Sequence, residues 1–126
     1  MDLAVLSQRS RQVIGAIVPD CEQREQAFTV VRGGIDPAML VPFIGYIQGV
    51  REEFSQYRHN GDTGACARLM HSVKGVGGAV GFPELSVLGA VAEDLAKLGD
   101  REGLVKVDLV LDQWLAVMQS VTKEQA

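Results

Sequence analysis

The sequence predicts an all-α fold, an antiparallel four-helix bundle with an additional N-terminal helical segment. Apolar residues recur at spacings of three and four along most of the chain, while strand-like alternation is nearly absent. Groups of glycine, proline and aspartate separate the last helices and leave room for loops of only a few residues. Because short loops join antiparallel neighbours, these helices should pack as a bundle.

The N-terminal segment begins with an amphipathic helix from about Asp2 to Val18, which Pro19-Asp20 ends. The following segment, from Cys21 to Arg32, is compatible with a helix or a strand, because its residues Ala27-Phe28-Thr29-Val30-Val31 fit both. Gly33-Gly34 closes this segment in either case.

The next helix has a start signal, but it also contains a proline that could interrupt it. Asp36-Pro37 offers an N-cap followed by a first-turn proline, but Pro42 would break or kink a helix already under way, so we expect a bend near Pro42. Apolar residues then keep helical spacing until His59-Asn60-Gly61 stops the helix.

The remaining helices have clear start and stop signals. Asp62 caps a helix that contains His71 and runs to about Val80, before Gly81-Phe82-Pro83 turns the chain. Pro83 opens the next helix, which Gly99 ends. Asp100 caps the last helix. Its apolar seam includes Trp114, for which we expect a place in the core.

The helix that contains His71 carries most of the functional information. With a rotation of about 100° per residue, Lys74 and several small residues lie within about 60° of His71 on the helix surface. The small residues are Gly64, Ala67, Gly75 and Gly78. The opposite side carries Leu69, Val73, Val76 and Val80, so we expect those residues to face the core and His71 to face solvent. One imidazole, one ammonium group and a surface without bulky side chains suit a phosphoryl group.

Composition and charge narrow the function classes. Hydrophobic residues at 47% and charged residues at 22% are typical of a globular chain. The net charge of −4, with Lys and Arg scattered, argues against a nucleic-acid surface. No apolar run approaches the ~20 residues of a membrane span, and the start of the chain lacks the basic region of a secretory signal. We therefore expect a cytoplasmic protein that binds neither nucleic acid nor membrane.

Other chemical sites fit the sequence poorly. Gly75-Val76-Gly77-Gly78 follows a helix and lacks the Gly-Lys-Ser/Thr ending of a nucleotide loop. His71 has no second metal ligand at a suitable spacing, and we interpret His59, at a helix end, as structural or merely exposed. Cys21 and Cys66 lie far apart without ligand spacing, so we expect reduced, buried thiols.

From about Pro42 to Val121, the chain resembles the histidine-containing phosphotransfer (HPt) domain family. The family motif reads roughly His-x-Leu-Lys-Gly, with a further glycine ten positions after the histidine. In this chain His71, Lys74, Gly75 and Gly81 match the motif, and Val73 replaces the leucine.

The resemblance continues on the following helix with two departures nearby. Leu85, Gly89 and Ala92-Glu93 correspond to a leucine, a small residue and a Leu-Glu pair in the family, so Ala92 departs from the pattern. Met70 stands where the family often has alanine. We therefore expect one domain over residues 1–126, with a helical extension over residues 1–41 and a four-helix bundle core over residues 42–121.

The resemblance implies that the chain is a histidine phosphotransfer protein of a two-component phosphorelay. His71 would accept a phosphoryl group at Nε2 from a receiver-domain aspartate and pass it to another receiver, while Lys74 would stabilise the phosphoryl group. The expected partner-binding residues are Gly64, Ala67, Arg68, Ser72, Gly75 and Gly78. The implied partners are response-regulator receiver domains and a hybrid sensor kinase.

The same resemblance implies a phosphocarrier without ATP-dependent kinase activity. We expect no cofactor or metal on this chain, because it has no carboxylate cluster for Mg²⁺, and the ion should be held by the partner receiver domain. We also expect a monomer.

Two alternatives remain open at this stage. The chain could be the phosphoacceptor domain of a chemotaxis-type histidine kinase, a class in which the pair Gly81-Phe82 is familiar. It could also be a helical interaction module in which His71 is incidental.

Overall fold

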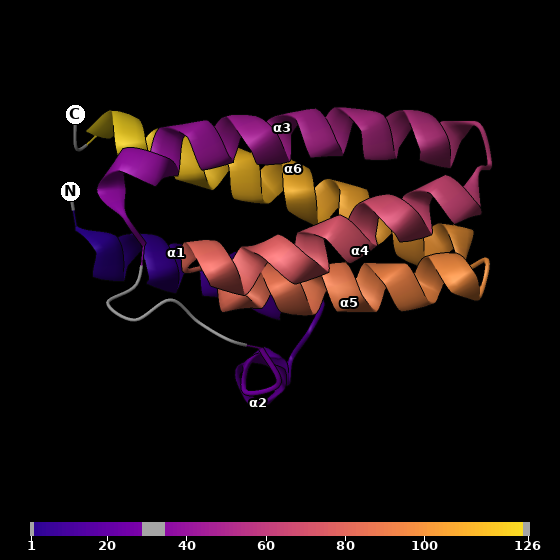
Figure 1. The fold of residues 1–126 in the computed structure, drawn as a ribbon, viewed down its shortest axis with the longest axis horizontal. Helices are drawn as coiled ribbons and strands as arrows, with labels where there is room; N and C mark the ends of the chain where they lie inside the picture. Colours follow the sequence, from indigo (N-terminus) through magenta and orange to yellow (C-terminus); the bar gives the residue numbers. More distant parts are fainter. Residues whose placement is uncertain (1, 29–34, 125–126) are drawn as a thin grey trace.

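The computed structural model describes residues 2–28 and 35–124, which form six α-helices and no strand. In chain order these are α1 (Leu3–Gly15), α2 (Cys21–Glu25), α3 (Pro37–His59), α4 (Thr63–Val80), α5 (Pro83–Lys97) and α6 (Arg101–Glu124). Helices α3 to α6 lie lengthwise beside one another, and α1 packs alongside α6 (Figure 1). The predicted all-α bundle with an N-terminal helical segment is confirmed. None of the described helices is long and apolar enough to span a membrane.

Local signals in the sequence set the helix ends. Aspartate side chains cap three bundle helices, each accepting a hydrogen bond from a backbone N–H. They are Asp36 before α3, Asp62 before α4 and Asp100 before α6. Glycines with positive φ follow the ends of α3, α4 and α5, at Gly61 (71°), Gly81 (109°) and Gly99 (70°) respectively. This left-handed conformation favours glycine, so the predicted short loops are confirmed.

The N-terminal half differs from the expected boundaries. Helix α1 ends at Gly15, and Asp2 is its N-cap. Helix α3 starts at Pro37 and continues through Pro42, where we expected a bend. Pro42 and Ala38 are both exposed, so water can solvate the Ala38 carbonyl, whose partner N–H the proline lacks. The predicted glycine stop at residues 33–34 lies outside the described residues.

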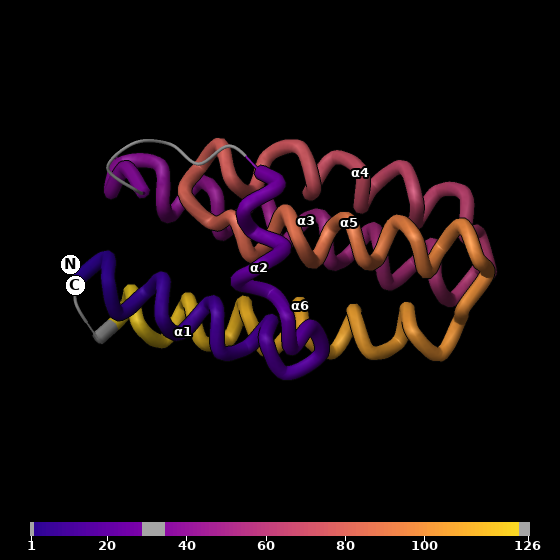
Figure 2. The backbone as a smooth tube through the Cα atoms, turned by 90° about the horizontal axis from the view of Figure 1, so that it is seen from below, coloured from indigo at the N-terminus to yellow at the C-terminus, as the bar shows by residue number. Residues whose placement is uncertain are grey.

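The helices of the N-terminal segment are attached to the bundle in different ways. Ser10 of α1 is fully buried, and its hydroxyl oxygen accepts a 2.7 Å hydrogen bond from the indole N–H of Trp114 in α6. Trp114 itself is fully buried, as predicted. Helix α2 lies across α5 and is seen nearly end-on in Figure 1, whereas the view from below in Figure 2 shows its course across the bundle. Arg11 of α1 pairs with Glu25 of α2 through two hydrogen bonds of 2.7 and 3.0 Å.

Both cysteines are free and buried, as predicted. Burial raises the pKa of the Cys21 thiol to about 12 and also raises the pKa of Cys66. Both groups are therefore thiols, not thiolates, at neutral pH, and they serve as small core residues.

The closest helix contact is between α4 and α5, and glycines make it possible. A Cβ atom on Gly89 would lie 2.5 Å from the backbone nitrogen of Lys74 and 2.8 Å from the carbonyl oxygen of Met70. A Cβ on Gly77 would similarly lie 2.6 Å from the backbone nitrogen of Ser86. The two backbones therefore approach within a distance that no other residue type permits at these positions.

We expect Gly89→Ala to lower the free energy of unfolding by about 1–3 kcal/mol, because the added methyl group must push α5 away from α4. Gly75→Ala is the matched control, since a Cβ on Gly75 meets nothing within 4 Å. The control should be neutral or stabilising by up to about 1 kcal/mol, because alanine favours helix. Urea denaturation measures both, and equal stability of the two variants would contradict this packing.

Glu84, in the first turn of α5, is a buried carboxyl group at the junction with the N-terminal segment. Only 1% of the residue is exposed, and neither side-chain oxygen has a hydrogen-bond partner within the described part of the chain. Burial raises the pKa of this carboxyl above its ordinary value of 4.5 and outweighs the opposing effect of the nearby Ser10 hydroxyl. Folding therefore favours the protonated form of Glu84.

This raised pKa predicts a pH-dependent stability. The contribution of Glu84 is fully present below pH 4.5, and it is lost as the pH rises through the higher pKa of the folded state. Glu84→Gln should remove this loss and make the protein more stable than wild type at pH 8. Thermal unfolding across pH 4–8 is the measurement, with Glu102→Gln, in the exposed first turn of α6, as control. A parallel pH profile for wild type and Glu84→Gln would refute this role.

Candidate functional site

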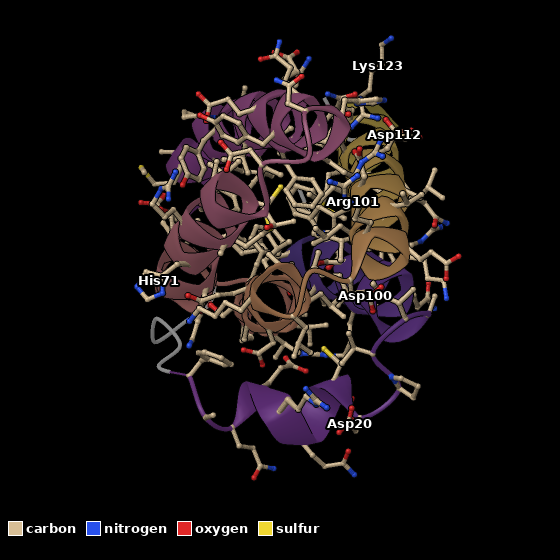
Figure 3. The ribbon with its side chains drawn as sticks, turned by 90° about the vertical axis from the view of Figure 1, so that its right-hand side faces the viewer. Asp20, His71, Asp100, Arg101, Asp112 and Lys123 are labelled. Carbon is tan, nitrogen blue, oxygen red and sulfur yellow. The ribbon has the colours of Figure 1, made fainter. Side chains whose placement is uncertain are left out.

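His71 lies on the outer surface of α4, as its helical position predicts. Its side chain is 69% exposed, and Figure 3 shows it at the margin of the bundle, pointing away from the core. The helix holds the ring in the open, where a second molecule can reach it.

Glu93 of α5 fixes one nitrogen of the His71 ring. Nδ1 of His71 lies 2.9 Å from Oε2 of Glu93, whose side chain is only 9% exposed. An ionised carboxylate accepts hydrogen bonds but donates none, so Nδ1 of His71 carries the proton and donates it to Glu93. The lone pair of the neutral ring is then on Nε2, and a held Nδ1–H is the usual way to select that tautomer.

Two lysines lie close to the His71–Glu93 pair. Lys74 Nζ lies 3.6 Å from Oε1 of Glu93, and Lys97 Nζ lies 3.4 Å from Oε2. Burial alone would raise the pKa of Glu93, but the charge of Lys97 and the hydrogen bond from His71 outweigh it and hold this pKa below its ordinary value. Glu93 is therefore ionised at neutral pH, which supports its role as the acceptor for Nδ1–H.

The buried face of α4 is rotated from the one that the sequence predicted. Ala67 and Gly78, which we expected on the open surface beside His71, are buried. Fully buried Met70 and Val73 mark the true core face, and Leu69 lies only partly in the core. The small residues of α4 allow close packing on α5, which turns that side of the helix inward. The expected surface residues that are exposed are Gly64, Arg68, Ser72 and Gly75.

A hollow of about 490 Å³ opens beside His71. Its walls come from three parts of the chain. Helix α4 contributes His71, Lys74, Gly75, Gly78 and Ala79, α5 contributes Ser86, and the turn after α2 contributes Ala27 and Phe28. The N-terminal segment thus reaches the site, which the sequence did not reveal.

The sequence indicates Glu93 only as part of a motif, and it does not identify Lys97 or the Ala27–Phe28 turn as parts of the site. In the structure Glu93, which follows the apolar residue Ala92 on α5, is only 7% exposed and therefore needs a partner. Its place in the motif was the signal that the sequence offered for this residue. Among the described residues, no group of three or more His, Cys, Asp or Glu side chains could hold a metal ion.

Comparison with known proteins gives one match. The family model described as Hpt domain matches residues 38–121. No curated protein and no solved structure matches the chain. The matched range contains His71, Lys74, Glu93 and Lys97 but ends short of the Ala27–Phe28 turn.

The geometry predicts a defined tautomer for His71. Long-range ¹H–¹⁵N NMR spectra of the imidazole should show Nδ1–H in the wild type, and Glu93→Ala should give a mixture of both tautomers because nothing then holds Nδ1. Asp94→Ala is the control, since this neighbouring carboxylate is exposed. If Glu93→Ala left the imidazole spectrum unchanged, the hydrogen bond would not determine the tautomer.

Proposed function

The chain belongs to the Hpt domain family, and from this premise we propose that His71 accepts a phosphoryl group from a receiver-domain aspartate and passes it to another receiver. Hpt domains act in phosphotransfer between receiver domains of two-component systems, and they are carriers without kinase activity of their own. The observation that supports His71 as the acceptor is its exposed imidazole with Nδ1 bound to a buried carboxylate.

In the proposed step, the lone pair on Nε2 of His71 attacks phosphorus in line with the bond to the aspartyl oxygen. The new N–P bond forms as the P–O bond breaks, and the aspartate leaves as a carboxylate. The ring keeps its proton on Nδ1 and gains a positive charge, which the Glu93 carboxylate, 2.9 Å from Nδ1, offsets. No proton needs to move in either direction.

The lysines have a second part in this proposal. Lys74 is 40% exposed and lies one helical turn from His71, so its ammonium group can turn from Glu93 toward the phosphoryl oxygens. Lys97 still pairs with Glu93 when Lys74 moves. Mg²⁺ and most of the stabilisation of the transition state belong to the receiver domain in this scheme.

The proposed docking surface follows the exposed part of α4. Gly64, Arg68, Ser72 and Gly75 lie on it around His71, so a receiver meets few bulky side chains there. Ala67 is buried, and we assign it to packing within the bundle. Gly78 is also buried, but it lines the hollow beside His71.

Receiver domains phosphorylated with ³²P acetyl phosphate test the proposal. We expect at least one receiver of a panel to label the wild type with acid-labile phosphate, and His71→Gln to abolish the label. His59→Gln is the matched control and should be labelled normally, because His59 binds the Ser55 carbonyl of its own helix α3. Absence of label from every receiver would refute the proposal. Label only from a kinase core with ATP would favour the phosphoacceptor domain of a kinase.

A further inference from the structure

The turn after α2 stands beside the proposed acceptor although it lies far from it in sequence. Ala27 and Phe28 form one wall of the hollow whose other wall carries His71 and Lys74. Figure 3 shows α2 beneath the bundle, running from Asp20 toward the edge where His71 lies. A molecule that reaches His71 over the hollow therefore meets this wall too.

Several contacts hold this wall in place. Cys21 at the start of α2 is 2% exposed, and Glu25 at its end binds Arg11 through both carboxylate oxygens. The backbone N–H of Phe28 then donates to the Glu25 carbonyl at 3.0 Å, and the Phe28 ring packs partly against the core. The wall is thus a built part of the fold up to Phe28, with Ala27 exposed on its rim.

The wall lies outside the part of the chain that the family model matches. The Hpt match begins at residue 38, so it includes His71 and Lys74 but not Ala27 or Phe28. Contacts at His71 and Lys74 alone resemble those that other members of the family offer. A contact at the wall offers a receiver a means of distinguishing this protein.

The chemistry of the hollow fits a receiver domain that carries a phospho-aspartate. The lining residues include Lys74 and no carboxylate among those described, so the surface suits an anionic group. The ring of Phe28 and the methyl group of Ala27 suit an apolar side chain at the margin of that anionic site.

We propose that Ala27 and Phe28 form a second contact for the receiver domain and determine which receiver exchanges phosphate with His71. The proposal rests on the proposed function, since it assumes that a receiver docks at His71. It predicts that changes at the wall alter transfer without altering the acceptor itself.

Ala27→Glu tests this contact, with Gln26→Glu as matched control. Both residues are exposed and adjacent, and both variants add one negative charge, but Gln26 lines a separate hollow near Arg11. We expect Ala27→Glu to slow transfer from the receiver that labels the wild type fastest by about tenfold, through repulsion of its phospho-aspartate site, and Gln26→Glu to change it less than about twofold. Phe28→Ala should reduce the preference for that receiver over the rest of the panel.

Phosphoramidate, a small phosphoryl donor, separates the possible failures. It should label His71 in Phe28→Ala as fast as in the wild type, and Ala27→Glu should slow it less than it slows the receiver, because phosphoramidate needs no docking surface. If phosphoramidate labels the wild type but no receiver does, the proposed function itself is wrong. If receivers label the wild type, and Ala27→Glu and Phe28→Ala leave the rates and the preference unchanged, the function stands and the second contact is wrong. Equal slowing with every receiver would overturn the role in selection.

Discussion

The close approach of α4 and α5 is the constraint on which the site depends. Gly89 lies against the backbone of Lys74, so the two helices meet without a side chain between them. Because the helices are antiparallel, one turn forward on α5 from Gly89 to Glu93 runs beside the turn on α4 that leads back from Lys74 to His71. The packing of α4 on α5 therefore also places the Glu93 carboxylate beside the His71 ring.

Positively charged and hydrogen-bonding neighbours offset the cost of burying the Glu93 carboxylate. A carboxylate that is 9% exposed loses most of its hydration, and it needs compensating partners to remain ionised. His71, Lys74 and Lys97 supply them from the solvent side, all within 3.6 Å. Both lysines stay in contact with solvent, since the side chain of Lys74 is 40% exposed and that of Lys97 is 64% exposed. Glu93 is thus buried enough to be fixed in position, yet its negative charge is retained for the imidazole.

The sequence predicted what depends on local signals. The caps at Asp62 and Asp100 and the stops at Gly81 and Gly99 act within a few residues, and the structure has all of them. It misplaced Gly78 because a glycine on a helix indicates either an open surface or a close helix contact, and only the partner helix decides between them. The pairing of His71 with Glu93 and the position of Ala27 depend on how distant segments align, which periodicity does not encode.

The fixed tautomer also bears on why such a site would suit a carrier. In the proposed transfer, a phosphoryl group on Nε2 leaves the ring positively charged, and the Glu93 carboxylate, which lies 2.9 Å from Nδ1 before transfer, would offset this charge. Since the proton stays on Nδ1, the forward and reverse reactions differ only in whether the phosphorus is bound to the aspartyl oxygen of the receiver or to Nε2 of His71. A group that had to gain or lose a proton would make one direction depend on an acid or base at the site. Without that requirement, the direction of the proposed transfer would depend on the receivers that dock.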